Sequence, residues 1–209
     1  MSRLSVVLPA CNEEPMVEKT CRTLRELLGQ AGIRYELVLV DDGSSDGTWA
    51  AIEKVSREDK NVTGVHFSRN FGKEAAIVAG LAQACGDAVA VMDCDLQHPP
   101  EILLEMYRLW KQGYEVVEGI KKNRGKETLF HRKSARFFYR IMSRATGFDM
   151  ENASDFKLLD RKAVESVLAM PERSMFFRAA SSWIGLKASP YLLRCRSVRP
   201  ENPNGLQER

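Results

Sequence analysis

Short apolar, β-branched runs alternate with helical segments through the first 120 residues, and this alternation is the strongest constraint on the fold. The predicted strands are residues 4–8, 35–40, 62–67, 88–92 and 115–119. The predicted helices between them are residues 16–28, 48–55, 73–85 and 99–112. Because the strand runs do not alternate regularly between polar and apolar residues, both faces of the strands should be buried under helices. The sequence therefore predicts an α/β fold with a mostly parallel central sheet and helices on both faces.

Composition excludes several other classes of protein. A length of 209 residues suits one domain, and 44% apolar with 28% charged residues excludes a disordered or fibrous chain. No run of about 18 apolar residues is present, so this chain contains no predicted transmembrane helix. The five cysteines are odd in number and form no C-x-x-C pair, which favours reduced thiols in a cytoplasmic protein.

Polar clusters follow four of the predicted strands directly. They are Asn12-Glu13-Glu14, Asp41-Asp42, Arg69-Asn70 and Asp93-Cys94-Asp95. In an open α/β sheet, ligands bind beyond the carboxyl ends of the strands, so these clusters are expected to form one site. Neither a G-x-G-x-x-G segment after the first strand nor a P-loop is present, which argues against a dinucleotide or P-loop NTPase site.

Two acidic clusters are candidates for specific chemistry. Asp93 and Asp95 occupy positions i and i+2 at a strand end, so they point to the same face and favour a bound Mg²⁺ or Mn²⁺. Gln97 could supply a further oxygen ligand. An ordinary acidic loop explains a lone D-x-D motif equally well. Asp42, with its neighbours in a Gly/Ser-rich turn, could accept hydrogen bonds from a base or ribose, although plain turn chemistry is the stronger explanation when this motif is taken alone.

A basic, aromatic segment covers residues 119–146. It contains nine lysine or arginine residues against Glu127 as its acidic residue, and Arg132, Arg136, Arg140 and Arg144 recur every four residues. Like charges at this spacing destabilise a helix by about 0.2–0.5 kcal/mol per pair, so an anionic partner should offset them. An anionic membrane surface is the favoured partner. A solvated face over a core stripe is an alternative, and nucleic-acid binding is not expected because no other feature resembles such a protein.

Four ordered motifs resemble those of the family 2 inverting glycosyltransferases with the GT-A fold. They are residues 9–14 (PACNEE), 40–48 (VDDGSSDGT), 68–73 (SRNFGK) and 92–101 (MDCDLQHPPE). Residues 70–73 and 95–97 are most similar to the polyprenyl-phosphate branch, which includes bactoprenol glucosyltransferases and dolichol-phosphate mannose synthases. The resemblance extends over residues 4–186, and Cys11 stands where the family usually has tyrosine.

The resemblance implies roles for the matching residues. The implied donor-binding residues are Pro9, Asn12, Glu14, Asp42, Lys73, Asp93 and Arg178. The implied metal ligands are Asp93, Asp95 and Gln97, holding Mg²⁺ or Mn²⁺. The implied catalytic residues are Asp95 and Asp155. The expected acceptor-binding residues are Arg124, Arg132, Lys133 and Arg136, all in the basic segment.

The function implied is metal-dependent, inverting transfer of a hexose from a nucleotide sugar to a polyprenyl phosphate. UDP-glucose is favoured over GDP-mannose by resemblance. A polysaccharide acceptor, a catalytically impaired nucleotide-sugar-binding paralogue and nucleotidyl transfer remain alternatives. The expected location is the cytoplasmic face of a membrane, as a peripheral protein, and a homo-oligomer is left open. Residues 1–186 are expected to form the GT-A domain, and residues 187–209 show little periodic pattern and are expected to be disordered.

Overall fold

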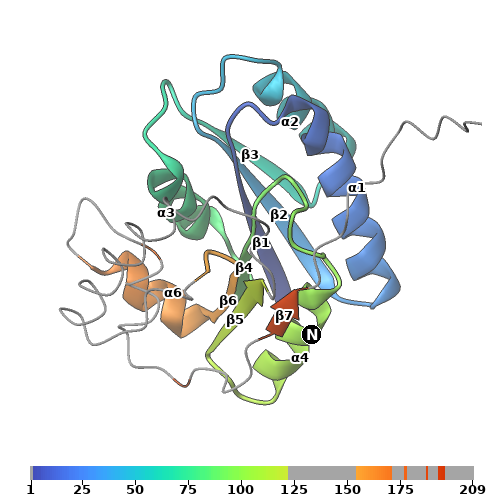
Figure 1. Cartoon of the computed structure of the whole chain (residues 1–209), viewed down its shortest axis with the longest axis vertical. Coiled ribbons are helices and arrows are strands. Elements are labelled where there is room, and N and C mark those ends of the chain that lie inside the picture. The colour runs from blue at the N-terminus through green and yellow to red at the C-terminus, as the bar shows by residue number, and fades with distance from the viewer. Residues whose placement is uncertain (1, 122–153, 171–176, 178–186, 188–192, 196–209) are drawn as a thin grey trace, which may run out of the picture.

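The computed structural model contains a seven-stranded sheet at the centre of the molecule (Figure 1). It describes residues 2–121, 154–170, 177, 187 and 193–195. The strands are β1 (Arg3–Ala10), β2 (Arg34–Asp41), β3 (Val62–His66), β4 (Ala88–Val91), β5 (Val116–Lys121), β6 (Lys157–Asp160) and β7 (Leu193–Cys195).

The strand order is β3-β2-β1-β4-β6-β5-β7. Strand β1 pairs in parallel with β2 and β4, and β2 pairs in parallel with β3. Strand β6 is antiparallel to both of its neighbours, β4 and β5, whereas β7 is parallel to β5. The predicted α/β class and mostly parallel sheet are therefore confirmed, with one antiparallel strand inserted near the middle.

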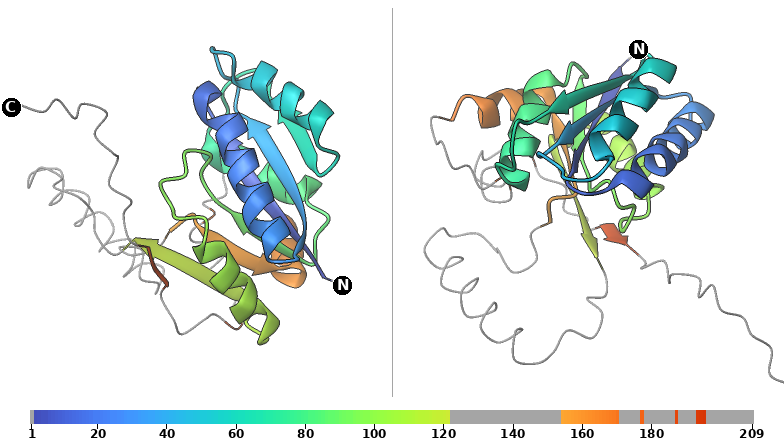
Figure 2. Two further views of the ribbon diagram at one scale, coloured as in Figure 1. Left: turned by 90° about the vertical axis from the view of Figure 1, so that its right-hand side faces the viewer. Right: turned by 90° about the horizontal axis from the view of Figure 1, so that it is seen from above.

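Helices cover both faces of the sheet (Figures 1 and 2). The helices are α1 (Glu14–Gln30), α2 (Thr48–Glu58), α3 (Lys73–Gln83), α4 (Ile102–Lys111) and α6 (Arg161–Leu168). The buried side chains of α1, α2 and α4 pack against one face, and those of α3 and α6 pack against the other. Strand residues alternate between the two layers, since Val6 and Leu8 lie in the first core and Val7 in the second.

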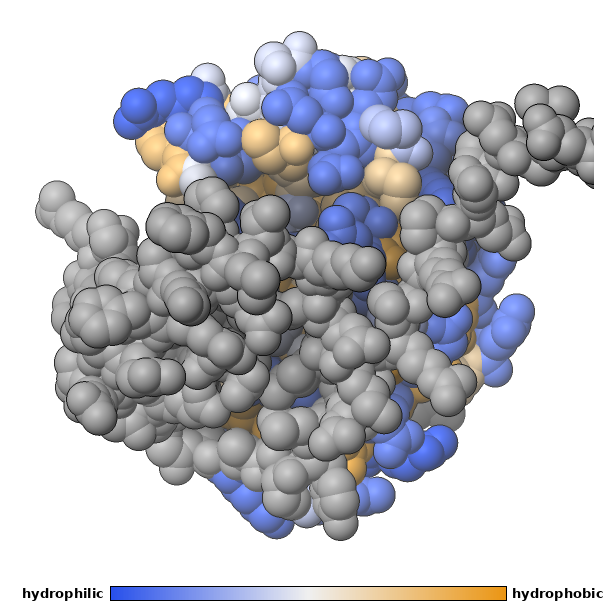
Figure 3. All heavy atoms as spheres, in the orientation of Figure 1, coloured by the Kyte–Doolittle hydropathy of each residue, from blue (hydrophilic) through white to orange (hydrophobic). Residues whose placement is uncertain are grey.

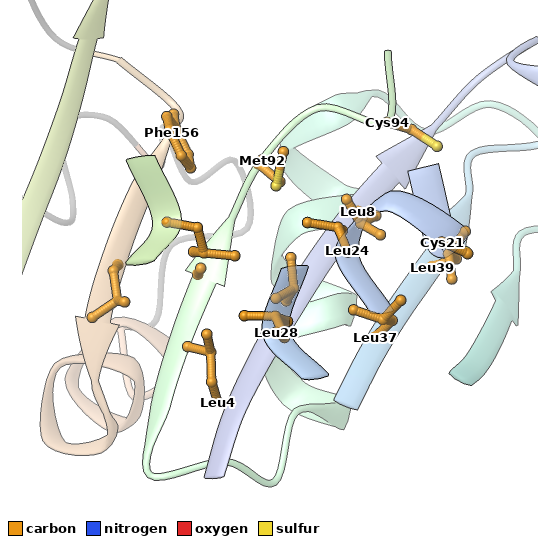
Figure 4. Packing of buried hydrophobic residues seen from close by; sticks show 14 of the residues in the cluster. Leu4, Leu8, Cys21, Leu24, Leu28, Leu37, Leu39, Met92, Cys94 and Phe156 are labelled. Atoms are coloured by element: carbon orange, nitrogen blue, oxygen red, sulfur yellow. The ribbon is translucent and has the colours of Figure 1, made fainter. Parts of the chain in front are cut away.

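Each covering helix presents a periodic apolar stripe to the sheet. In α1 the stripe consists of Val17, Cys21, Leu24 and Leu28, at the spacing expected for one helical face, and Pro15 lies in the first turn, where it is tolerated. Figure 4 shows Leu24 and Leu28 against Leu4 and Leu8 of β1 and Leu37 and Leu39 of β2. The first core therefore holds α1 against β1 and β2, the strands that lead into the polar loops at the carboxyl edge of the sheet.

Three elements were not predicted from the sequence. Strand β6 and helix α6 follow Asp155 directly, and β7 lies inside the segment 187–209 that was expected to be disordered. The backbone of β7 pairs with β5 from Gly119 to Lys121, so a neighbouring strand orders a segment with no periodicity of its own. Within the described part of the chain, no helix is long and apolar enough to cross a membrane.

The coloured surface in Figure 3 is mostly hydrophilic, with apolar groups scattered in small areas. Among the described residues, Phe71 is the large hydrophobic side chain that stands out, with 52% of its surface exposed. It lies in the loop between β3 and α3, next to the polar clusters at the carboxyl edge of the sheet. Isolated exposed apolar residues are normal, so the functional site has to be sought in the polar loops of that edge.

Candidate functional site

A cavity of about 220 Å³ opens at the carboxyl edge of the parallel strands. Strand register brings the ends of β1 and β2 together, since Ala10 pairs with Asp41, and β4 runs beside β1. The loops that follow these strands form the cavity. Its lining residues are Pro9, Ala10, Cys11, Glu13, Asp42, Lys73, Asp93, Cys94 and Asp95. Three of the four polar clusters predicted to share a site thus line this cavity, and the fourth lies in the loop beside it.

The loops after β1 and β2 are joined by reciprocal hydrogen bonds. The Asn12 N–H donates to Ser44 Oγ at 2.9 Å, and Asn12 Oδ1 accepts from the Ser45 N–H, also at 2.9 Å. Glu14 Oε2 accepts from the Gly47 N–H at 2.9 Å. Asn12 and Glu14, predicted to bind the donor, therefore use their side-chain oxygens to hold the neighbouring loop and are not among the cavity-lining residues.

Asp42 anchors the loop between β3 and α3. It is 3% exposed, and its Oδ1 accepts from the Phe71 N–H at 2.7 Å while its Oδ2 accepts from the Gly72 N–H at 3.0 Å. The next residue, Gly43, has φ of +63°, and a Cβ there would lie 2.2 Å from the carbonyl carbon of Arg69. Glycine is therefore required for the loop after β2 to lie directly against the loop that carries Phe71.

Lys73, the first residue of α3, joins two carboxylates from different segments, one after β4 and one before β6. Its Nζ lies 2.6 Å from Asp93 Oδ1 and 2.9 Å from Asp155 Oδ2. Burial alone would lower the pKa of Lys73, but the charges and hydrogen bonds of Asp93 and Asp155 outweigh it and raise the pKa. The ammonium is therefore charged at neutral pH, and it connects the end of β4 to the segment that leads into β6.

Glu13 is a cavity residue that the sequence analysis did not select. Burial raises its pKa, and repulsion from Asp95, Asp93 and Asp46 raises it further. A signal was available, because Glu13 lies inside the Asn12-Glu13-Glu14 cluster. The sequence could not show that Glu13 faces the cavity while its two neighbours hold the adjacent loop.

The donor atoms at this edge fit a hard divalent cation. Asp93 and Asp95 offer carboxylate oxygens beside the cavity, and the repulsion felt by Glu13 shows a concentration of negative charge there. Among the described residues, no cluster of three acidic, histidine or cysteine side chains is already arranged to hold a metal. Mg²⁺ commonly uses one or two carboxylates and completes its shell with phosphate and water, so two aspartates are sufficient.

The remaining predicted site residues lie outside the cavity lining, at its edge or beyond the described part of the chain. Gln97 is exposed, and its N–H donates to Asp95 Oδ1 at 2.9 Å, which shapes the turn after β4. Asp155 is buried beside the cavity through its contact with Lys73. The residues that lie outside the described part of the chain are Arg124, Arg132, Lys133, Arg136 and Arg178.

Comparison with known proteins identifies the family of this site. Residues 5–168 match the Glycosyl transferase family 2 sequence family. The chain belongs to this family. The matched segment begins in β1 and ends with α6, so it contains the cavity, Lys73 and Asp155. The family predicted from the four sequence motifs is confirmed.

Curated relatives of this family 2 chain are identical to it at more than a third of the aligned positions. It is 41% identical over 184 residues to the uncharacterized glycosyltransferase YkcC of Bacillus subtilis, which covers 88% of this chain and 57% of that protein. It is 36% identical over 186 residues to the prophage bactoprenol glucosyl transferase homolog of Escherichia coli, covering 88% of this chain and 61% of that protein. The chain thus spans about three fifths of the length of these relatives.

Solved structures confirm the fold of the family 2 chain. A mannosyltransferase from Pyrobaculum calidifontis, solved with GDP-Man and Mn²⁺, superposes with a TM-score of 0.65 at 21% identity, covering 96% of this chain and 58% of that one. Glucosyl-3-phosphoglycerate synthase from Mycobacterium tuberculosis, solved with Mn²⁺, UDP and glucosyl-3-phosphoglycerate, gives a TM-score of 0.59 at 22% identity, covering 79% and 59%. At these identities the likeness concerns the fold alone.

Proposed function

We propose that this chain carries the catalytic domain for inverting transfer of a hexose from a nucleoside-diphosphate sugar to a polyprenyl phosphate. The observation that carries the proposal is the cavity at the carboxyl edge of β1, β2 and β4, where Asp93, Asp95 and Lys73 meet. Lys73 also contacts Asp155, so an implied donor-binding residue and an implied catalytic residue lie at one point.

The charge of the cavity supports a requirement for a divalent cation. Of the described residues that line it, four are acidic (Glu13, Asp42, Asp93 and Asp95) and one, Lys73, is basic. When all five are ionised, three net negative charges remain, and an anionic diphosphate would be repelled. Asp93 and Asp95 would hold Mg²⁺ or Mn²⁺, and the cation would supply positive charge to neutralise the diphosphate leaving group.

Asp155 is held in an ion pair with Lys73. Its Oδ2 lies 2.9 Å from the Lys73 ammonium, so this carboxylate oxygen is already engaged by a cation at the edge of the cavity. A polyprenyl phosphate does not require a base, because the second pKa of a phosphate monoester is about 6 and the attacking oxygen is already anionic at neutral pH. Asp155 therefore positions Lys73 at the reaction centre while the phosphate oxygen attacks the anomeric carbon from the side opposite the diphosphate.

The names of the relatives and neighbours support the choice of substrates. The acceptor is proposed from the bactoprenol glucosyl transferases of Shigella phages and of Escherichia coli. The donor class and the cation are proposed from neighbours solved with GDP-Man or UDP and with Mn²⁺. Glucose and UDP are favoured over mannose and GDP because glucosyl transferases are among the relatives of higher identity. The basic segment 119–146, including Arg124, Arg132, Lys133 and Arg136, is proposed to hold the lipid phosphate at an anionic membrane surface.

The decisive test is a donor panel with a polyprenyl phosphate and Mn²⁺ in detergent, in which the lipid-linked sugar is measured. We expect product with one nucleotide sugar and none after chelation of the cation. Asp95→Asn should abolish transfer, because it removes one ligand charge from a half-buried position in the loop after β4 and leaves the core residues unchanged. Asp87→Asn is the matched control, since Asp87 lies at the opposite edge of the sheet, where its side chain accepts from the Arg3 N–H. Wild-type turnover by Asp95→Asn, with divalent cation still required, would contradict the metal-ligand role.

A further inference from the structure

The ammonium group of Lys73 already contacts Asp93, a carboxylate that is proposed to bind the divalent cation. Its Nζ is 2.6 Å from Asp93 Oδ1, which is one of the two carboxylates proposed to bind the metal. A divalent cation that uses the same oxygen would have to approach an ammonium group at close range. Two positive charges competing for one carboxylate repel each other strongly in a partly buried site.

The second contact of Lys73 keeps it in this position. Asp155 Oδ2 lies 2.9 Å from the same Nζ, and the Asp155 side chain is 9% exposed, against 35% for Asp93. Asp155 therefore holds the ammonium from the buried side while Asp93 takes the more accessible side. An arriving diphosphate offers new anionic oxygens to the ammonium, so Lys73 can leave Asp93 without becoming unpaired.

We propose that Lys73 is an internal counter-ion that competes with free divalent cation for Asp93, so that the cation binds together with the nucleotide instead of before it. This inference rests on the proposed function. Before the donor arrives, Lys73 reduces the repulsion among the cavity carboxylates. When the donor binds, its diphosphate takes over Lys73 and releases Asp93 for the cation. Binding of metal and nucleotide is then coupled, and the coupling must be reciprocal.

Substitution of Lys73 should leave the fold intact. Its side chain is 41% exposed, and the start of α3 is held by the backbone contacts of Phe71 and Gly72 with Asp42. The loss of Lys73 therefore removes a charge from the cavity without removing the anchor of the helix. If Lys73 had a purely structural role, its substitution should weaken the binding of both Mn²⁺ and nucleotide. If Lys73 competes with the cation for Asp93, its substitution should tighten the binding of Mn²⁺.

The test is a titration of the purified chain with Mn²⁺ alone, in which free Mn²⁺ is followed by electron paramagnetic resonance. Lys73→Met should bind Mn²⁺ roughly tenfold more tightly than the wild type, the low end of what a neighbouring charge does to a carboxylate. Lys73→Arg keeps the positive charge and should remain close to the wild type. Lys54→Met is the matched control, because it removes the same charge from a surface pair with Glu18. Asp93→Asn combined with Lys73→Met should lose the gain, which locates the effect at this carboxylate.

A second titration, with UDP or GDP present, separates this inference from the proposed function. Nucleotide should tighten Mn²⁺ binding in the wild type and do so less in Lys73→Met. If Lys73→Met binds Mn²⁺ no more tightly than the wild type while nucleotide still promotes Mn²⁺ binding, the counter-ion role is overturned and the proposed function stands. If Lys73→Met tightens Mn²⁺ binding but neither nucleotide has any effect, the competition between Lys73 and the cation for Asp93 stands, whereas the coupling to nucleotide and the proposed donor class are overturned.

Discussion

Asp42 combines two tasks at a single carboxylate. It lines the cavity at the carboxyl edge of the sheet, and it also accepts hydrogen bonds from the N–H groups of Phe71 and Gly72 in the adjacent loop. The second task explains why a carboxylate is buried directly after strand β2. A loss of activity after substitution could therefore come from either task, and the two need separate measurements.

Asp42→Ala should lower the free energy of unfolding by about 1–3 kcal/mol, because the half-buried N–H groups of Phe71 and Gly72 lose their carboxylate acceptor. Asp42→Asn keeps one acceptor oxygen and should retain most of that stability. Both variants should weaken nucleoside diphosphate binding by about 1–3 kcal/mol if the carboxylate itself holds the donor. Urea unfolding and calorimetry measure the two quantities. If Asp42→Asn binds nucleotide as the wild type does, Asp42 acts through the loop alone.

The cysteines offer a direct footprint of the cavity. Cys11 lines the cavity and is exposed, and Cys85 is exposed at the opposite edge of the sheet, before β4. Burial, the largest cause, raises the pKa of both Cys21 and Cys94 to about 12. At pH 8 the two buried thiols are therefore protonated as well as inaccessible, and they should not react.

We expect a thiol reagent to modify Cys11 and Cys85 of the folded chain, measured in a Cys195→Ser background. UDP with Mn²⁺ should slow modification of Cys11 by about a hundredfold at a ligand concentration of about 100 Kd, since only the free form reacts. Cys85 should react at an unchanged rate. Peptide mapping by mass spectrometry distinguishes the two sites. Equal protection of both thiols would indicate a global change in the protein. Protection of neither thiol would contradict nucleotide binding in this cavity.

At the scale of single residues, the sequence predicted types of chemistry better than orientations. Pro9, Asp42, Lys73, Asp93 and Asp95 meet at one cavity, because strand ends in a parallel sheet lie on the same edge. The exchange of roles between Glu13 and its two neighbours was not predictable, since a loop lacks the fixed periodicity that assigns side chains to faces. The backbone of Asn12, with φ of 56°, is one such irregular position.

At the scale of elements, the insertion of β6 between β4 and β5 places Asp155 in the site. Strand β6 is antiparallel and only four residues long, and helix α6 follows it without a loop. Its apolar pair, Leu158 and Leu159, packs on opposite faces of the sheet, so neither strand nor helix periodicity is visible in so short a run. The earlier strands were predictable because each is bounded by turn residues and by a longer amphipathic helix.

Asp160 fixes the junction between β6 and α6. Its Oδ1 accepts from the Lys162 N–H at 3.0 Å as the N-cap of α6, and its Oδ2 accepts from Trp110 Nε1 of α4 at 2.8 Å. One side chain thus connects helices that cover opposite faces of the sheet. Loss of the cap would leave an unpaired N–H in α6 and an unpaired indole N–H in α4.

Asp160→Ala should reduce the free energy of unfolding by about 0.5–2 kcal/mol, the usual cost of a lost N-cap, with a further cost for the stranded indole N–H. Trp110→Phe is the matched variant, because it removes the indole donor and leaves the cap. Urea unfolding of the two single variants and the double variant gives the coupling between them. If the effects of Asp160→Ala and Trp110→Phe simply add, the contact between α4 and α6 contributes nothing to stability.

At the scale of the whole molecule, positive charge is concentrated in one segment. Nine of the 31 basic residues but only one of the 28 acidic residues lie in residues 119–146, so the rest of the chain has 22 basic against 27 acidic residues. The net charge of +3 is therefore the sum of a strongly basic segment and an acidic remainder of the chain. Such a molecule is expected to approach an anionic surface in one orientation, with the basic segment first.

Reversal of Arg136 and Arg140 to glutamate should therefore weaken binding to anionic lipid vesicles. Each basic residue near such a surface contributes about 1 kcal/mol within a Debye length, so affinity should fall many-fold and should fall further with added salt. Lys54→Glu with Arg57→Glu is the control, because it makes the same change of net charge on α2 by altering exposed ion pairs of little energetic value. Cosedimentation with vesicles of phosphatidylglycerol and phosphatidylcholine measures the affinity.

Nucleotide binding in solution should be unchanged in both double variants. If Arg136→Glu with Arg140→Glu binds vesicles normally but loses nucleotide affinity, the basic segment belongs to the donor site and not to the membrane surface.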